Sequence, residues 1–94
     1  MNLEEFKKSV EDKQKPDGIN ILLTSLWEER VGNWDKAHNI SQDEKTEDSA
    51  LIHAYLHRRE GDESNAKYWY NRANSSMPEY DMDEEWLCLV KKFL

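Results

Sequence analysis

Apolar residues recur along this 94-residue sequence at spacings of three and four, which is the period of one face of an α-helix. Leu3, Phe6 and Val10 form a narrow apolar stripe, so we expect a short amphipathic helix over about residues 2–12. After a proline break, a wider apolar face predicts a core helix over about residues 18–31. That face consists of Ile19, Leu22, Leu23, Leu26 and Trp27.

A pair of adjoining helices organises the rest of the chain, and the two helices meet at Gly61. The first is expected over residues 49–60, with basic residues in its last turn, where they favour the negative end of the helix dipole. Gly61 stands where a left-handed residue ends a helix, and Asp62 is an N-cap for the second helix. The short connection predicts an antiparallel αα-hairpin, in which Ala54 and Ala66 allow the two backbones to approach.

Two further helices complete the predicted fold. Asn33 precedes a short helix, and the acidic run over residues 41–48 then indicates a loop whose start can extend that helix. The short helix bears Trp34, Ala37, His38 and Ile40. Asp81, with Glu84 three residues later, resembles a capping box that opens a final amphipathic helix. The sequence therefore predicts an all-α fold of five to six helices and no strand, in a single domain over residues 1–94.

The central hairpin resembles the second half of a tetratricopeptide repeat, in which a helix ends at Gly and then Ala, an aromatic residue, Ala and Pro follow. These positions are Gly61, Ala66, Tyr70, Ala73 and Pro78. Gly32 and Ala37 repeat the first spacing, while the first half of the repeat matches only at Ala54. The resemblance implies a tetratricopeptide-like, right-handed array of antiparallel αα-hairpins over about residues 18–78, with a C-terminal capping helix. The phrase H-R-R-E-G-D-x-x-N-A-x-Y-W also resembles a small uncharacterised bacterial family, which implies no activity.

Charge and composition limit the kinds of partner that this protein is expected to bind. The chain has 20 Asp and Glu residues against 13 Lys and Arg, a formal net charge of −7 at pH 7, so its average surface repels nucleic acid and anionic membranes. No apolar run approaches the roughly 18 residues of a membrane span, and the single Cys88 cannot form an intramolecular disulfide. We therefore expect a cytoplasmic protein that binds neither nucleic acid nor a membrane. A homodimer is left open, because short repeat folds often complete themselves by dimerising.

The function that the sequence favours is that of an interaction module, in which a helical surface binds a protein or peptide partner. On the helix over residues 49–60, His53 and His57 lie about 60–100° from the core-facing stripe, at the border between packed and solvated surface. That stripe consists of Ala50, Leu51, Ala54, Tyr55 and the stem of Arg58. Trp69 is expected to reach the same groove edge across the hairpin. The predicted partner-binding residues are therefore His53, His57, Arg58 and Trp69, with no cofactor.

The alternative for the two helical histidines is a site for a metal ion or a small ligand. Two imidazoles four residues apart point the same way, and His38 can approach them from the neighbouring helix. No metal ligand set is assigned, because neither an H-E-x-x-H motif nor a cysteine pair accompanies them. For Arg58, Arg59 and Arg72, pairing with nearby acidic side chains is favoured over binding of an anion. Cys88 is expected to be a packed thiol rather than a nucleophile, and we expect no enzyme activity.

Overall fold

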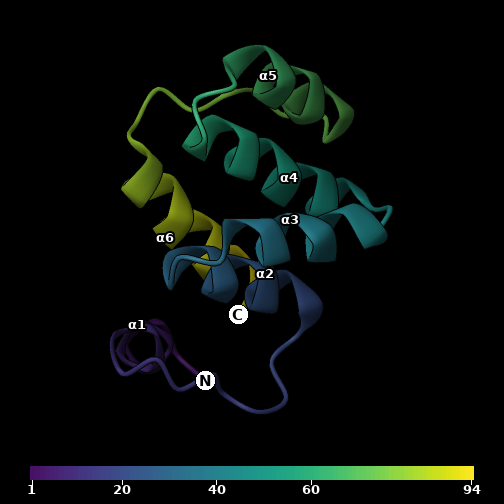
Figure 1. Cartoon of the computed structure of the whole chain (residues 1–94). Coiled ribbons are helices and arrows are strands. Elements are labelled where there is room, and N and C mark those ends of the chain that lie inside the picture. The colour runs from purple at the N-terminus through teal and green to yellow at the C-terminus, as the bar shows by residue number, and fades with distance from the viewer.

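The structure, a computed structural model, describes residues 1–94 and contains six α-helices and no strand, which confirms the predicted all-α class (Figure 1). The helices are α1 (Leu3–Glu11), α2 (Ile21–Arg30), α3 (Trp34–Asp43), α4 (Glu47–Arg59), α5 (Glu63–Arg72) and α6 (Met82–Phe93). Helices α2 and α3 form one hairpin, and α4 and α5 form a second. Helix α2 begins three residues later than expected, because the side chain of Asn20 caps it by accepting from the N–H of Leu23 at 2.9 Å.

Both hairpins turn at a glycine with a positive φ, which was predicted for Gly61 and also holds for Gly32. The φ angle is +100° at Gly32 and +90° at Gly61, in the region that a side chain disfavours. The N–H of Gly61 donates to the carbonyl of Arg58 at 3.1 Å, and that of Asp62 donates to the carbonyl of His57 at 2.9 Å. The same pair of hydrogen bonds occurs at Gly32. Two left-handed C-terminal caps therefore set the direction of both returning helices.

The connection between α3 and α4 is shorter than the loop expected over residues 41–48. Helix α3 continues through Asp43 and α4 begins at Glu47. Thr46 and Ser49 form a reciprocal cap at the start of α4: the Thr46 side chain accepts from the Ser49 N–H at 3.1 Å, and the Ser49 hydroxyl accepts from the Thr46 N–H at 3.0 Å. Glu47 and Asp48 of the acidic run therefore lie in the first turn of α4, where carboxylates favour the helix dipole.

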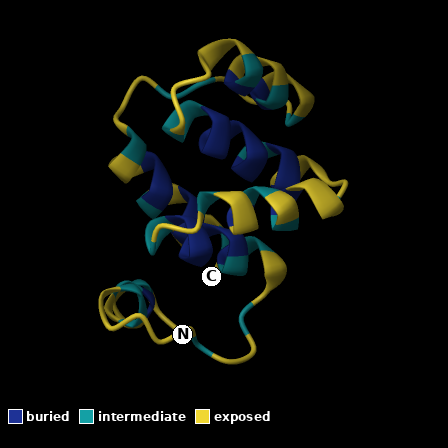
Figure 2. Cartoon of the chain, viewed as in Figure 1, coloured by how far each residue is buried: buried dark blue, intermediate teal, exposed yellow.

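Helix α4 lies at the centre of the molecule, in contact with α2, α3, α5 and α6 (Figure 2). Every residue from 52 to 57 is buried. A main apolar cluster joins α4 to α1, α2, α3 and α6 through Phe6, Leu23, Leu26, Trp27, Ala37, Ile52, Tyr55, Leu56, Trp86, Leu89 and Val90. A smaller cluster of Ala54, Ala66 and Tyr70 closes the hairpin of α4 and α5. The predicted position of Ala66 in the hairpin contact is thus confirmed.

Helix α6 covers the ends of α2 and α4. Its Trp86 donates an indole N–H to the carbonyl of Leu26 at 3.1 Å, and its ring centroid is 5.8 Å from that of Phe6 on α1. The expectation that Cys88 is packed is wrong, because the inward face of α6 is formed by Glu85, Trp86, Leu89 and Val90, and the thiol is exposed.

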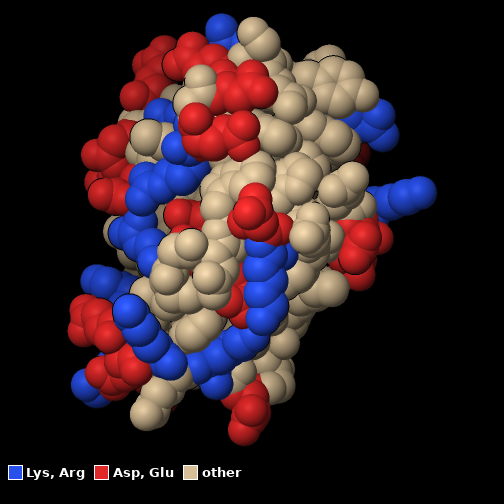
Figure 3. Space-filling model, viewed as in Figure 1, with Lys and Arg blue, Asp and Glu red and all other residues tan.

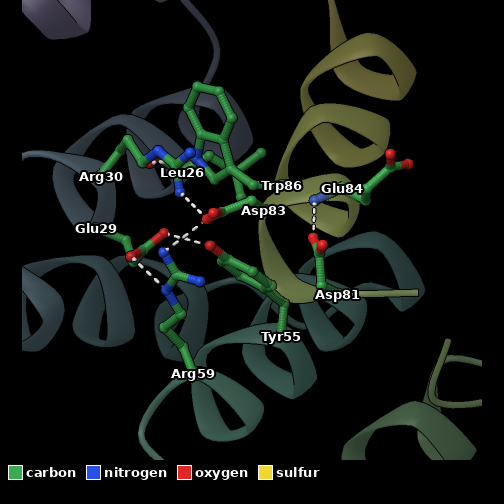
Figure 4. Close-up of polar contacts among 9 residues, drawn as sticks. All are labelled: Leu26, Glu29, Arg30, Tyr55, Arg59, Asp81, Asp83, Glu84 and Trp86. Atoms are coloured by element: carbon green, nitrogen blue, oxygen red, sulfur yellow. Dashed lines mark hydrogen bonds and ion pairs between the residues drawn. The ribbon is translucent and has the colours of Figure 1, made fainter. Parts of the chain in front are cut away.

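A polar junction joins α2, α4 and α6 (Figure 4). The buried Glu29 accepts a hydrogen bond of 2.5 Å from the hydroxyl of Tyr55 and lies 3.5 Å from the Nε of Arg59. Asp83 accepts from Arg30 at 2.8 Å and from Arg59 at 3.0 Å. Arg59 forms ion pairs, but its partners are Glu29 of α2 and Asp83 of α6 and not the acidic side chains near Gly61 that were expected from the sequence.

The outer surface carries charges of both signs. On the face drawn in Figure 3, basic side chains lie among acidic ones. None of the six helices has both the length and the apolar content that crossing a bilayer requires.

Candidate metal centre

All three histidines of the chain meet between α3 and α4. His38 comes from α3, and His53 and His57 come from successive turns of α4. The ring centroids of His38 and His53 are 4.4 Å apart, and those of His53 and His57 are 4.7 Å apart. His38 and His57 are 5.2 Å apart. One nitrogen from each ring lies within 4.8 Å of the other two. We call these three residues the histidine cluster.

Short side chains allow the two helices to approach closely at this point. Ala37 and Ser41 of α3 are buried, as is Ala50 of α4, and none of these residues fills much space between the backbones. The indole N–H of Trp34 donates to the carbonyl of Leu56 at 2.8 Å. This hydrogen bond joins the start of α3 to the last turns of α4, and so it fixes which residues of the two helices face each other.

Two indole rings flank the histidine cluster. Trp34 stacks on His38 at a centroid distance of 4.9 Å and an interplanar angle of 16°. Trp69 of α5 lies 4.1 Å from His53 at an angle of 34°. Trp34 and His38 are four residues apart, as are His53 and His57, so each pair occupies one face of its helix. The indoles therefore cover the cluster from two sides and limit its contact with water.

His53 and His57 are buried, with exposed fractions of 4% and 7%, and the prediction of a border position is wrong. The prediction treated α4 as an amphipathic helix with one packed face. In the structure four helices surround α4, so this part of the helix has no solvated side. His38 is the most accessible member of the cluster and is half-buried.

Burial also favours the uncharged form of His53 and His38. Burial, followed by the neighbouring imidazoles of His38 and His57, lowers the pKa of His53 to about 4. The pKa of His38 is lowered as well, chiefly by burial and then by His57. The carboxylates of Glu60 and Asp35 oppose this second shift without cancelling it. His38 and His53 are thus predominantly neutral at pH 7, which is the form that binds a metal ion.

Neighbouring groups favour one tautomer of the imidazole rings of His53 and His57. Ser41 Oγ lies 3.4 Å from His53 Nδ1, and because it donates its own hydrogen to the His38 carbonyl at 2.9 Å, it must accept from Nδ1–H. Glu60 Oε2 lies 3.6 Å from His57 Nδ1 and favours a proton on that nitrogen. Both contacts leave the lone pair on Nε2, and that of His57 has only a weak contact of 3.5 Å with the side-chain nitrogen of Asn65.

The ring nitrogens of the cluster all lie within 4.8 Å of one another. Nitrogen ligands at about 2.0–2.1 Å from a tetrahedral Zn²⁺ are about 3.3 Å apart. Rotation of the half-buried His38 is the simplest adjustment towards that spacing. Only weak contacts oppose it, because no ring nitrogen of the cluster has a protein hydrogen bond shorter than 3.4 Å.

A second group of possible ligands, His57, Glu60 and Asp62, shares one residue with the histidine cluster. Its two carboxylates are exposed. Asp62 already caps α5, where its side chain accepts from the N–H of Asn65 at 3.3 Å. The histidine cluster is therefore the better candidate, since two of its three residues are buried and none of them caps a helix.

The structure brings together three of the four binding residues predicted from the sequence. His53, His57 and Trp69 are neighbours, whereas Arg58 lies elsewhere and pairs with the buried Glu85 of α6 at 2.9 Å. Its other nitrogen donates to the carbonyl of Tyr80 at 2.7 Å.

Two residues of this site were not among the four predicted. His38 was recognised as able to approach, and Trp34 was assigned only to a helix. The repeated four-residue spacing of Trp34 with His38 and of His53 with His57 is a signal that links them.

A cavity of about 440 Å³ adjoins the cluster on the side of His53 and Trp69. It lies between the α3–α4 connection and the end of α5, and eleven residues line it, only two of which are hydrophobic. Arg72, at the end of α5, is among them. The cavity gives a small polar molecule a place beside the imidazole of His53.

No family model, no curated protein and no solved structure matches this chain. An inference about the function of this protein therefore has to rest on the geometry of the site.

Proposed function

We propose that this protein binds a divalent transition-metal ion through His38, His53 and His57. The observation that carries the proposal is that every histidine of the chain, although drawn from two helices, offers a nitrogen within 4.8 Å of the others. The lowered pKa values of His53 and His38 and the weak hydrogen bonds of the rings support it, because a metal ion binds the neutral imidazole and has only weak contacts to displace.

The ligand set favours particular ions. Imidazole nitrogen suits Zn²⁺, Ni²⁺, Cu²⁺ and Fe²⁺, whereas Ca²⁺ and Mg²⁺ prefer oxygen. Three histidines are a known set for Zn²⁺ with a fourth position left to water or another ligand. Two ligands from successive turns of α4 and one from α3 would connect these helices through the ion. Zn²⁺ is the first ion to test.

The experiment is a calorimetric titration of metal-free protein with Zn²⁺, paired with the absorption spectrum of the Co²⁺ form. We expect one site per chain and a visible spectrum typical of tetrahedral Co²⁺. His38→Gln is the main variant, because His38 is half-buried and its replacement leaves the two buried histidines in place. It should lower the affinity for Zn²⁺ about a hundredfold, since it removes one of three ligands.

Asp62→Asn is the matched control. Asparagine retains the capping of α5 and removes a carboxylate of the competing ligand group. The variant should bind Zn²⁺ as the parent does. If Asp62→Asn loses the metal and His38→Gln keeps it, the ion is held by the competing group and the histidine cluster is not the site. Absence of Zn²⁺, Ni²⁺ and Cu²⁺ binding by the folded parent chain would end the proposal.

A protein or peptide partner is the second candidate. It is favoured by Tyr68, which is 52% exposed on α5 and has its ring centroid 5.3 Å from that of Trp69. An exposed tyrosine beside a half-buried tryptophan is a typical anchor in an interface. Tyr68→Ala should abolish capture of such a partner without changing the affinity for Zn²⁺, which separates the two functions.

A further inference from the structure

The cavity beside His53 contains polar groups of two kinds, those that the fold already uses and those that it leaves free. The hydroxyl of Ser41 donates to the carbonyl of His38, and that of Ser49 donates to the carbonyl of Glu44 at 2.7 Å. Thr46 accepts from the backbone in its cap. These hydroxyl groups complete the ends of α3 and α4 and are not free for a ligand.

Three of the free groups carry hydrogen-bond donors, and a fourth, the carboxylate of Glu44, is an acceptor. Gln42 and Lys45 line the cavity, and their side chains make no hydrogen bond or ion pair with the protein. Arg72 lines it from α5, and its one hydrogen bond goes to the hydroxyl of Tyr68 at 3.1 Å. An amide, an ammonium and a guanidinium thus border one cavity without an acceptor from the protein, and the carboxylate of Glu44 borders it without a donor. The lining therefore offers donors to a carboxylate and an acceptor to hydroxyl groups.

Arg72 differs from the other arginines of the chain. Arg30, Arg58 and Arg59 each form an ion pair with a carboxylate. Arg72 forms none, so the ion pairing expected for it from the sequence is wrong, although acidic residues outnumber basic ones by 20 to 13. Its guanidinium carbon lies 5.4 Å from the ring centroid of Trp69 and 5.8 Å from that of Tyr68. Contact with these rings steadies the planar group and leaves nitrogen donors for a planar acceptor.

We infer that this cavity binds a small hydroxy monocarboxylic acid, with the carboxylate on Arg72 and the body of the molecule against Trp69 and the connection between α3 and α4. The fork of the guanidinium matches a carboxylate in a bidentate pair. Glu44 and Glu47 also line the cavity and balance the two cations, which disfavours a dianion such as phosphate. The volume of about 440 Å³ is far more than a lone inorganic anion fills.

The polar lining of the cavity indicates the chemistry of the ligand outside its carboxylate. With only Ala50 and Trp69 hydrophobic among the eleven lining residues, the cavity favours a hydroxylated body over an apolar one. The inference does not rest on the metal site, because each of the groups named is present in the chain without an ion. It is therefore tested on metal-free protein.

The probe is gluconate, a polyhydroxy monocarboxylate, titrated into metal-free protein in a calorimeter. Sorbitol is the matched uncharged compound, and inorganic phosphate is the matched anion without a body. We expect binding of gluconate, no heat with sorbitol, and phosphate binding at least about tenfold weaker, in line with one charge-assisted bidentate pair. Nuclear magnetic resonance of the indole N–H groups should show the signal of Trp69 shifting with gluconate.

Arg72→Lys tests the guanidinium itself, because it keeps the charge and removes the fork. The residue is exposed, so the variant should fold as the parent does. It should bind gluconate about tenfold more weakly. Lys67→Met, an exposed position on the same helix that does not line the cavity, is the control and should bind as the parent does. Equal binding of sorbitol, tighter binding of phosphate, unchanged affinity in Arg72→Lys, or no binding of gluconate would each overturn the inference.

Discussion

The imidazole rings of His38 and His53 lie 4.4 Å apart between centroids, although one belongs to α3 and the other to α4. Their contact depends on how α3 is aligned along α4. The hydrogen bond of 2.8 Å from Trp34 to the carbonyl of Leu56 holds that alignment from one end. Residues that bind no metal therefore control the geometry of the proposed ligands.

Trp34→Phe tests this control. Phenylalanine retains a ring that can stack on His38 and removes the indole N–H, while the Leu56 carbonyl keeps its bond from the N–H of Glu60. We expect a loss of about 0.5–1.5 kcal/mol in the free energy of unfolding and about a tenfold loss of Zn²⁺ affinity. Urea unfolding and calorimetry measure the two effects. An unchanged Zn²⁺ affinity would show that the alignment does not depend on this bond.

The pH dependence of stability should report on His53. Its pKa of about 4 in the folded chain is lower than its ordinary value, so the unfolded chain binds a proton more readily. Stability of the metal-free protein should therefore fall as the pH drops from about 6.5 to about 4, by roughly 2–3 kcal/mol from this residue. Chemical unfolding at several pH values gives the curve. His53→Gln should flatten it across that window, and an equally steep curve in this variant would assign the loss to other groups.

Gly61→Ala tests the second hairpin turn. The φ angle of +90° disfavours an alanine, while nothing lies within 4 Å of the position that a Cβ would take. The cost should therefore come from the backbone alone and amount to about 1–2 kcal/mol. Gly61→Asn is the comparison, because asparagine tolerates a left-handed conformation better and should cost less. Equal melting temperatures for the parent and the alanine variant would contradict the turn geometry.

Ala66→Leu tests the packing of α5 on α4. Ala66 is fully buried against Ala54 and Tyr70, so a larger side chain should overpack the contact and cost about 1–3 kcal/mol. Ser64→Leu, at an exposed position of the same helix, should change stability by less than about 0.5 kcal/mol. Thermal unfolding compares the two. A leucine at position 66 that leaves the stability of the parent intact would mean that the helices are not in close contact there.

Tyr70→Phe tests a buried hydrogen bond at the same hairpin. The hydroxyl of Tyr70 donates at 2.5 Å to Glu85, which also accepts from Arg58 at 2.9 Å. Its removal should cost about 1.5–3 kcal/mol, because the acceptor is a buried carboxylate. Tyr68→Phe, on the exposed side of α5, is the control and should be close to neutral. Similar losses in both variants would show that the hydroxyl of Tyr70 has no special role.

The sequence was sufficient for the parts of the fold that local chemistry determines. Gly61 and Asp62 end one helix and begin the next for reasons contained in a few neighbouring residues. The burial of His53 and His57 could not be deduced in the same way, because it depends on how many helices surround α4. A helix that is covered on all sides shows no clear polar face, and the periodicity of its sequence then misplaces its border residues.

The partners in the ion pairs could not be predicted from local sequence either. Proximity in sequence favoured acidic partners near the turn for Arg58, whereas its carboxylate partner is Glu85 on α6. A side chain on a central helix finds its partners on other elements, and their identity follows only from the packing. The role of His38 likewise required the structure, since α3 and α4 had to be placed side by side.

The contact of Trp86 with Leu26 affects the order in which the helices pack while the chain is being synthesised. Its hydrogen bond partner Leu26 precedes it by 60 residues, and α6 covers an apolar face of α2 that is made much earlier. A chain that emerges from its N-terminus therefore exposes that face until α6 has been made. Helices α3 to α5 have time to associate first, so Trp86 closes the molecule last. A nascent chain stalled before Met82 should bind chaperones that recognise exposed apolar surface, and release should follow the appearance of α6.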